Sequence, residues 1–157
     1  MFSEEAKQQL DNLIKKYPNK KAALLPALWI AQEQYGGFVP PEALREVAGY
    51  LELSPAEVEG VATFYTMYNK TPVGANHLEV CHNIACMVRG ADDLIEHIAN
   101  KLGIEKGETT PDRQFTLSGA ECLGACANAP CMMVGPIYYE DLTIDKADKI
   151  IDELARK

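Results

Sequence analysis

The chain has 157 residues, of which 47% are hydrophobic, and its formal net charge is -8. A chain of this length can bury a hydrophobic core. Its five cysteines are therefore not needed as stabilising disulfides, as the cysteines of very small secreted domains are. The acidic balance argues against a nucleic-acid partner, because affinity for nucleic acid comes mainly from Lys and Arg that neutralise phosphates.

The N-terminal sequence, MFSEEAKQQL, has acids where a secretory signal has a basic segment and an apolar run. The longest apolar stretch, residues 22–31, is about half as long as a membrane span and contains Pro26. We therefore expect a cytoplasmic chain without direct membrane insertion. Thiols stay reduced in that compartment, so clustered cysteines more often bind metal or carry out redox chemistry than form disulfides.

Helical periodicity dominates the chain up to residue 73. Ser3 is placed to cap a first helix and Pro18 to end it, while Pro26 either kinks the second helix or lies in its first turn. Helices are expected at residues 6–17, at about 22–35, after Pro40 and Pro41, and after a capping box of Ser54 and Glu57. Residues 1–73 are thus predicted to form an N-terminal helical bundle.

After Gly74 the pattern alternates between strands and helices. A tight turn at Gly135-Pro136 is expected between the last two strands, and Asp145 is expected to cap the last helix. Strands are predicted at residues 77–80, 115–117, 132–134 and 137–140, and helical faces at 91–102 and 147–154. The fold class is therefore α+β or α/β: a helical bundle followed by a small α/β domain over residues 74–157.

All five cysteines lie in the second half. Cys81 and Cys86 form a C-x4-C motif, Cys122 and Cys126 form a C-x3-C motif, and each pair follows a predicted strand. The two loops can meet at one end of the sheet and present four thiolates to a single metal site. Cys131 begins an apolar strand, so we expect a small buried hydrophobic residue there rather than a fifth ligand.

The surroundings of the four cysteines favour a 2Fe-2S cluster over a single zinc ion. Such a cluster is larger than one ion and is anionic, so it needs small neighbours and N–H donors. Ala85, Gly124, Ala125 and Ala127 flank the cysteines, and we expect the helix after Cys86 to direct free N–H groups at the site. Zinc stays open as an alternative, because tetrahedral zinc also accepts four cysteines.

Motifs in both halves carry a family resemblance. They are AQEQYGG (31–37), VATFYTMY (61–68), PVG (72–74), VCHNIAC (80–86), GETT (107–110), ECLGACANAP (121–130) and YYEDLT (138–143). With them the chain resembles the thioredoxin-like 2Fe-2S subunit of respiratory NADH:quinone oxidoreductase (complex I), the NuoE type. It is also similar to diaphorase subunits of NAD-linked hydrogenases and formate dehydrogenases. Arg113 departs from the family pattern, which usually has glycine after the aspartate.

The resemblance implies one 2Fe-2S cluster bound by Cys81, Cys86, Cys122 and Cys126, and a thioredoxin-like fold for the second half. It also implies a flavin- and NADH-binding partner subunit, with the helical half as docking machinery, on the peripheral arm of a membrane-associated complex. The chain would be a subunit of an oxidoreductase and by itself an electron carrier. Three alternatives stay open: a diaphorase subunit, a zinc-stabilised interaction module, and a free ferredoxin.

Overall fold

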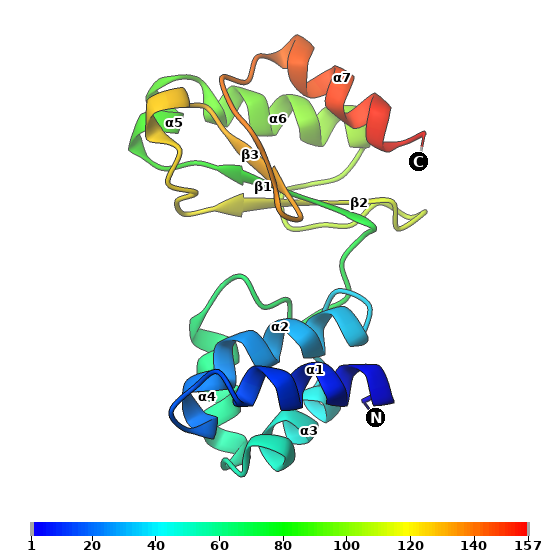
Figure 1. Ribbon diagram of the computed structural model, residues 1–157. Coiled ribbons are helices and arrows are strands. Elements are labelled where there is room, and N and C mark those ends of the chain that lie inside the picture. Colours follow the sequence, from blue (N-terminus) through cyan, green and yellow to red (C-terminus); the bar gives the residue numbers. More distant parts are fainter. Residues whose placement is uncertain (1, 157) are drawn as a thin grey trace. The chain divides into compact units, whose positions relative to one another are not determined.

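The computed structural model describes residues 2–156 and contains two compact units, of which the first ends at Pro72 and the second begins at Val73. The first unit is built of helices alone, and the second is a sheet covered by helices (Figure 1). The expected α+β composition is therefore confirmed. None of the helices within residues 2–156 has the length and apolar character needed to cross a bilayer.

The helices of the first unit begin where their caps predict. The Ser3 hydroxyl accepts a hydrogen bond from the Ala6 N–H, and Ser54 and Glu57 form the expected capping box. Pro26 lies in the first turn of its helix, where no intrahelical N–H bond is lost. The elements are α1 (Glu4–Ile14), a 3-10 turn η1 (Lys20–Ala23), α2 (Leu24–Gln34), α3 (Pro41–Leu51) and α4 (Pro55–Phe64).

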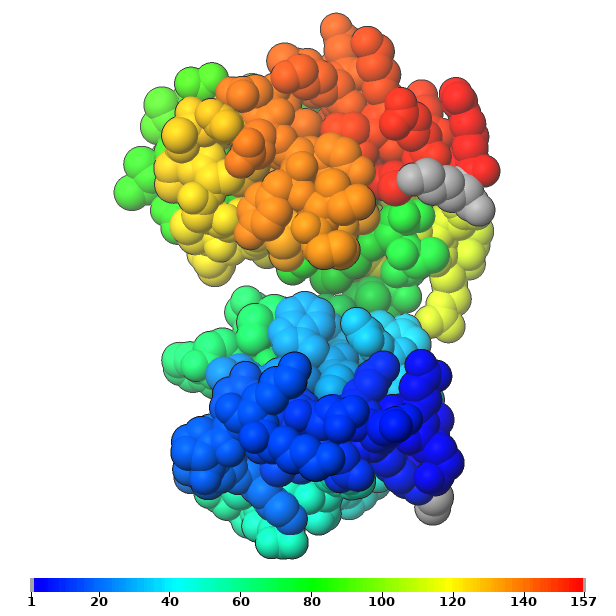
Figure 2. All heavy atoms as spheres, in the orientation of Figure 1, coloured from blue at the N-terminus to red at the C-terminus, as the bar shows by residue number. Residues whose placement is uncertain are grey.

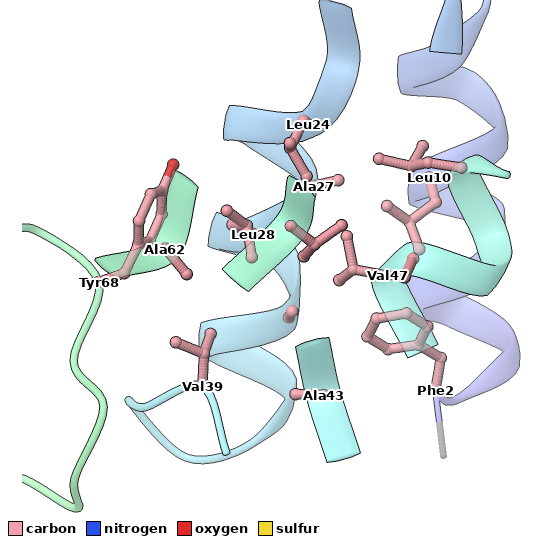
Figure 3. Packing of buried hydrophobic residues seen from close by; sticks show 14 of the residues in the cluster. Phe2, Leu10, Leu24, Ala27, Leu28, Val39, Ala43, Val47, Ala62 and Tyr68 are labelled. Atoms are coloured by element: carbon pink, nitrogen blue, oxygen red, sulfur yellow. The ribbon is translucent and has the colours of Figure 1, made fainter. Parts of the chain in front are cut away.

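The apolar faces of these helices enclose one core, part of which is shown in Figure 3. Tyr68 is fully buried in it and donates a hydrogen bond to the Leu25 carbonyl at 2.7 Å. Gln32, also buried, accepts from the Asn69 N–H at 2.7 Å and so ties the segment after α4 back to α2. Phe64 behaves differently, because 77% of it is exposed. The aromatic run of residues 64–68 thus contributes both to this core and to the surface.

The second unit contains a four-stranded sheet in the order β2-β1-β3-β4. Strands β1 and β2 are parallel, whereas β3 is antiparallel to β1 and to β4. The elements are β1 (Asn76–Cys81), α5 (Ile84–Val88), α6 (Ala91–Leu102), β2 (Phe115–Ala120), a 3-10 turn η2 (Cys126–Asn128), β3 (Met132–Val134), β4 (Ile137–Tyr139) and α7 (Ile144–Leu154).

Two local expectations were wrong. The predicted helix over residues 91–102 is α6, but an unpredicted helix, α5, precedes it and is separated from it by Gly90, which adopts a left-handed conformation with φ of 90°. Cys86 therefore lies inside α5 rather than before a helix. The cap of α7 is Thr143, whose hydroxyl accepts from the Lys146 N–H, and Asp145 lies in the first turn instead.

The core of the second unit lies between one face of the sheet and helices α6 and α7 (Figure 1). Leu78 and Val80, two residues apart on β1, are fully buried on this face, as alternation along a strand requires. The parallel register aligns Cys81 with Ala120, the last residues of β1 and β2. The loops that follow these two strands therefore leave the sheet at the same edge.

The turn before β2 holds a residue in an unfavourable backbone conformation. Arg113 has φ of 58°, in the left-handed region that favours glycine. Its N–H donates to the Thr110 carbonyl at 2.8 Å, and its carbonyl accepts from the Ala75 N–H at 2.9 Å. Both hydrogen bonds are made by the backbone, so they do not depend on the arginine side chain.

Replacing Arg113 with glycine is expected to stabilise the protein by up to about 1 kcal/mol, because glycine adopts positive φ without the Cβ clash. Urea unfolding of the two proteins measures the difference. The Arg113→Ala variant is the matched control, since it removes the side chain but keeps the clash and should show no gain. Equal stabilisation by alanine would mean that the arginine side chain, not its backbone, is the source of the cost.

Candidate metal centre

Three cysteine side chains meet at the edge of the sheet where β1 and β2 end. Cys81 is the last residue of β1, Cys86 lies in α5, and Cys131 comes just before β3. Their Sγ atoms all lie within 4.8 Å of one another, and the Cys86 and Cys131 sulfurs are 3.9 Å apart. All three residues are buried, with Cys131 fully enclosed. They form a three-thiol group in the interior.

Asn83 shapes the turn that brings Cys86 to Cys81. Its Oδ1 accepts a hydrogen bond from the Ile84 N–H at 2.8 Å and caps α5. Its Nδ2 donates to the Glu121 carbonyl at 2.6 Å and so ties the loop after β1 to the loop after β2. One side chain therefore both starts the short helix and joins the two cysteine-bearing loops.

The loop after β2 carries Cys122 and Cys126, and both are exposed. The Gly124 N–H donates to the Cys122 sulfur at 3.4 Å, and the Leu123 N–H donates to the sulfur of Cys81. Figure 1 shows this loop beside α5 at the same end of the sheet, and in Figure 2 it forms part of the surface. The loop thus contacts the three-thiol group through its backbone.

Among residues 2–156, the ligand atoms of Cys122 and Cys126 lie outside the group whose members are all within 4.8 Å of one another. A single zinc ion would need all four ligands together. A 2Fe-2S cluster places two thiolates on each of two irons, so its ligands form two pairs rather than one compact group. The buried pair of Cys81 and Cys86 and the exposed pair in the facing loop have that division. The assignment of these four residues as ligands stays a prediction.

Cys131 is the residue whose position sequence reasoning missed. It is buried, as a small apolar residue would be, but it lies against two proposed ligands rather than in the main core. Its backbone carbonyl also accepts from the Cys81 N–H at 3.1 Å, which fixes it beside the end of β1. No cysteine spacing indicates this contact, because it arises from the antiparallel pairing of β3 with β1.

The three thiols differ in acidity. Burial would raise the pKa of Cys81, but hydrogen bonds from the N–H groups of Asn83 and Leu123, together with those from the thiols of Cys86 and Cys131, hold that pKa below its ordinary value. Burial and the neighbouring Cys81 sulfur raise the pKa of Cys86. Burial raises the pKa of Cys131 to about 12.

The walls of the site are small and apolar. Ala91 and Ala129 are fully buried against the three-thiol group, and the partly buried neighbours are Ala85, Leu123 and Ala125. The anion of a 2Fe-2S cluster would find backbone N–H donors here beside mostly small apolar side chains. The donor set and its walls thus fit such a cluster.

The three histidines have polar partners other than the cysteines. His82 Nε2 lies 3.7 Å from a Glu121 carboxylate oxygen, and its ring covers Gly119, where an added Cβ would be 2.8 Å from the ring. His77 pairs with a serine hydroxyl on β2 and His97 with an aspartate on α7. The histidine rings therefore lie against hydroxyl or carboxylate oxygens rather than against the cysteine sulfurs.

Comparison with known proteins gives a consistent family. The model of the thioredoxin-like [2Fe-2S] ferredoxin family matches residues 10–155. The E subunit of NADH-quinone oxidoreductase from Rickettsia bellii is 48% identical over 146 residues, 92% of this chain and 87% of that protein. The mitochondrial NADH dehydrogenase (ubiquinone) flavoprotein 2 of Dictyostelium discoideum is 41% identical and covers 98% of this chain and 63% of that protein.

Solved structures share the fold. The NAD+-reducing [NiFe]-hydrogenase in its air-oxidised state matches with a TM-score of 0.71 at 22% identity, over 85% of this chain and 23% of that chain. At this identity the likeness concerns the fold alone. Together with the family match, it confirms the predicted thioredoxin-like ferredoxin class.

Replacing Asn83 with alanine is expected to lower the free energy of unfolding by about 1 kcal/mol, because α5 loses its cap. Urea unfolding measures the change. The Asn83→Ser variant keeps a capping oxygen but cannot reach the Glu121 carbonyl with an amide, so it should recover only part of the loss. An alanine variant as stable as the parent would exclude this side chain as the joint between the two loops.

Proposed function

This chain belongs to the thioredoxin-like [2Fe-2S] ferredoxin family, and we infer that it is the NuoE-type electron-transfer subunit of an NADH:quinone oxidoreductase. The observation that carries this inference is the 48% identity to the Rickettsia bellii protein over 92% of the chain. The cofactor is one 2Fe-2S cluster, and we assign its ligands as Cys81, Cys86, Cys122 and Cys126. The activity is that of an NADH dehydrogenase assembly, to which this chain contributes electron transfer.

The chain's residues contribute a site of defined shape and charge. When bound, a 2Fe-2S cluster accepts and releases one electron at a time. The N–H groups of Asn83 and Leu123 point at the Cys81 sulfur and stabilise negative charge there. The apolar wall limits water on the buried side, where Cys86 lies. Donors that are fixed before reduction need little rearrangement when the charge changes.

A partner has to supply the site for NADH. NADH gives up a hydride, which is a two-electron event, so a flavin must stand between it and a one-electron carrier. The chain has no G-x-G-x-x-G after a strand and no G-x-x-x-x-G-K-[ST]. We therefore propose a flavin- and NADH-binding subunit as the neighbour. Its expected location with this chain, on the cytoplasmic peripheral arm of the complex, stays a prediction.

We propose the helical unit as the part that docks on this neighbour. Four of its aromatic side chains are exposed: Phe64 (77%), Trp29 (43%), Tyr17 (38%) and Tyr65 (38%). The Phe64 and Tyr65 rings pack edge to face, with centroids 5.0 Å apart. Exposed aromatic side chains are enriched in protein interfaces, where they contribute much of the binding energy.

The alternatives are less well supported. A diaphorase subunit of a hydrogenase shares the fold, but the likeness to that class is at 22% identity, whereas the likeness to the NADH-quinone oxidoreductase subunit of Rickettsia bellii is at 48%. A zinc-stabilised module is disfavoured because the family that matches residues 10–155 is one of 2Fe-2S ferredoxins.

Protein purified without oxygen is expected to contain about two irons and two acid-labile sulfides per chain, with an EPR signal only after reduction. Serine at Cys81, Cys86, Cys122 or Cys126 should lose or distort this signal, because each removes a proposed ligand. Cys131→Ser is the matched control and should keep the signal. One zinc and no iron in the parent chain would refute the cofactor, and retention of the signal in any of the four variants would refute that ligand.

Mixed with NADH without oxygen, the isolated chain should not be reduced, whereas bleaching of its visible bands should follow when the flavin subunit is added. A second prediction concerns docking. At limiting concentrations of the flavin subunit, Phe64→Ser should lower the rate at which the cluster is reduced, because the substitution weakens docking. Glu59→Gln, on the same helix and also exposed, is the control. Equal bleaching with and without the flavin subunit would overturn the electron-carrier role, and unchanged kinetics in Phe64→Ser would exclude docking through this residue.

A further inference from the structure

The fifth cysteine occupies a position that its role as a buried apolar residue does not explain. The Cys131 sulfur is 3.9 Å from the Cys86 sulfur and within 4.8 Å of the Cys81 sulfur. The Cys86 contact has the geometry of a hydrogen bond in which either sulfur is able to donate. Cys131 is fully buried among alanine side chains. The sulfurs of Cys86 and Cys81 are thus close neighbours of its thiol in this pocket.

The proposed function decides which sulfur donates. A cysteine that binds iron is a thiolate and has no proton to give. If Cys86 and Cys81 are ligands, the shared proton belongs to Cys131, and both neighbours act only as acceptors. A free thiol in buried, apolar surroundings keeps its proton at neutral pH. The bond therefore runs from the Cys131 S–H to a ligand sulfur.

We propose that the Cys131 thiol is a hydrogen-bond donor to the ligand sulfur of Cys86 and that it raises the reduction potential of the bound cluster. The proposal rests on the proposed function, because it requires a cluster on Cys81 and Cys86. It makes Cys131 a positioning residue that tunes the electron carrier without binding iron. Neither the spacing of the cysteines nor the family match assigns this role.

The direction of the effect follows from charge. Two ferric ions, two sulfides and four thiolates carry a formal charge of about -2, which becomes about -3 on reduction. A donor aimed at a ligand sulfur stabilises the more negative state more strongly, and the low polarity of the pocket increases the difference. The donor therefore favours reduction. Its removal should lower the potential.

The experiment is a redox titration of the full chain, monitored by the EPR signal of the reduced cluster. It compares the parent with three variants. Cys131→Ala removes the donor and should lower the midpoint potential. Cys131→Ser replaces the thiol with a hydroxyl donor of similar size and should keep the potential close to that of the parent. Met132→Leu changes the adjacent, fully buried side chain, which has no donor, and should leave the potential unchanged.

Two outcomes of the redox titration would overturn the inference. Equal midpoints in the parent and Cys131→Ala would show that the thiol has no influence on the cluster. If the midpoint potential falls equally in the Cys131→Ala and Cys131→Ser variants, the effect comes from the loss of packing or of the sulfur atom at this position rather than from the loss of a hydrogen-bond donor. If the alanine variant does not fold, Cys131→Val, which fills the space without a donor, takes its place.

Metal analysis separates this inference from the proposed function. A parent chain without iron and sulfide would refute the function itself. If the parent contains two irons while the Cys131→Ala and Cys131→Ser variants fold but contain no iron, Cys131 is a ligand. That result would overturn its role as a donor. As a second readout, the reduced parent in H2O should show a hyperfine coupling to the Cys131 S–H proton, and exchange into D2O should remove it. The Cys131→Ala variant should show no such coupling. Identical couplings in the two proteins would also overturn it.

Discussion

The parallel pairing of β1 with β2 is the constraint on which the metal centre depends. It aligns Cys81 with Ala120, so the loop after each strand leaves the sheet at the same edge. Parallel neighbours need a long crossover, which here contains α5 and α6. Asn83 then holds the two loops together across the edge. The loops that carry the two cysteine pairs, which are far apart in the chain, are brought together in this way.

In this acidic chain, backbone N–H groups and small apolar side chains surround the buried cysteine sulfurs. The N–H groups that reach the Cys81 sulfur belong to Asn83 and Leu123, and the pocket wall is made of alanines and a leucine. The site therefore depends on the shape of two loops, and a chain with a net charge of -8 is still suited to bind an anionic cluster.

Local signals predicted the elements with strong caps or long periodic faces, such as the helix begun by Ser54 and the turn at Gly135-Pro136. The five-residue helix α5 escaped prediction because it is shorter than two helical turns and so has no measurable period. The contact of Cys131 with Cys86 could not be predicted either. It results from the antiparallel register of β3 on β1, and no local sequence pattern indicates that register.

The unequal exposure of the cysteines has a consequence for oxidative damage. Oxidants act first on thiolates that solvent can reach, taking them to sulfenic acid and then to a disulfide. Cys122 and Cys126 are exposed, whereas Cys81, Cys86 and Cys131 are buried. Attack by peroxide on the isolated chain should therefore begin in the loop after β2, which peptide mapping after brief exposure would locate. A partner that covers this loop would act as a shield as well as an electron donor.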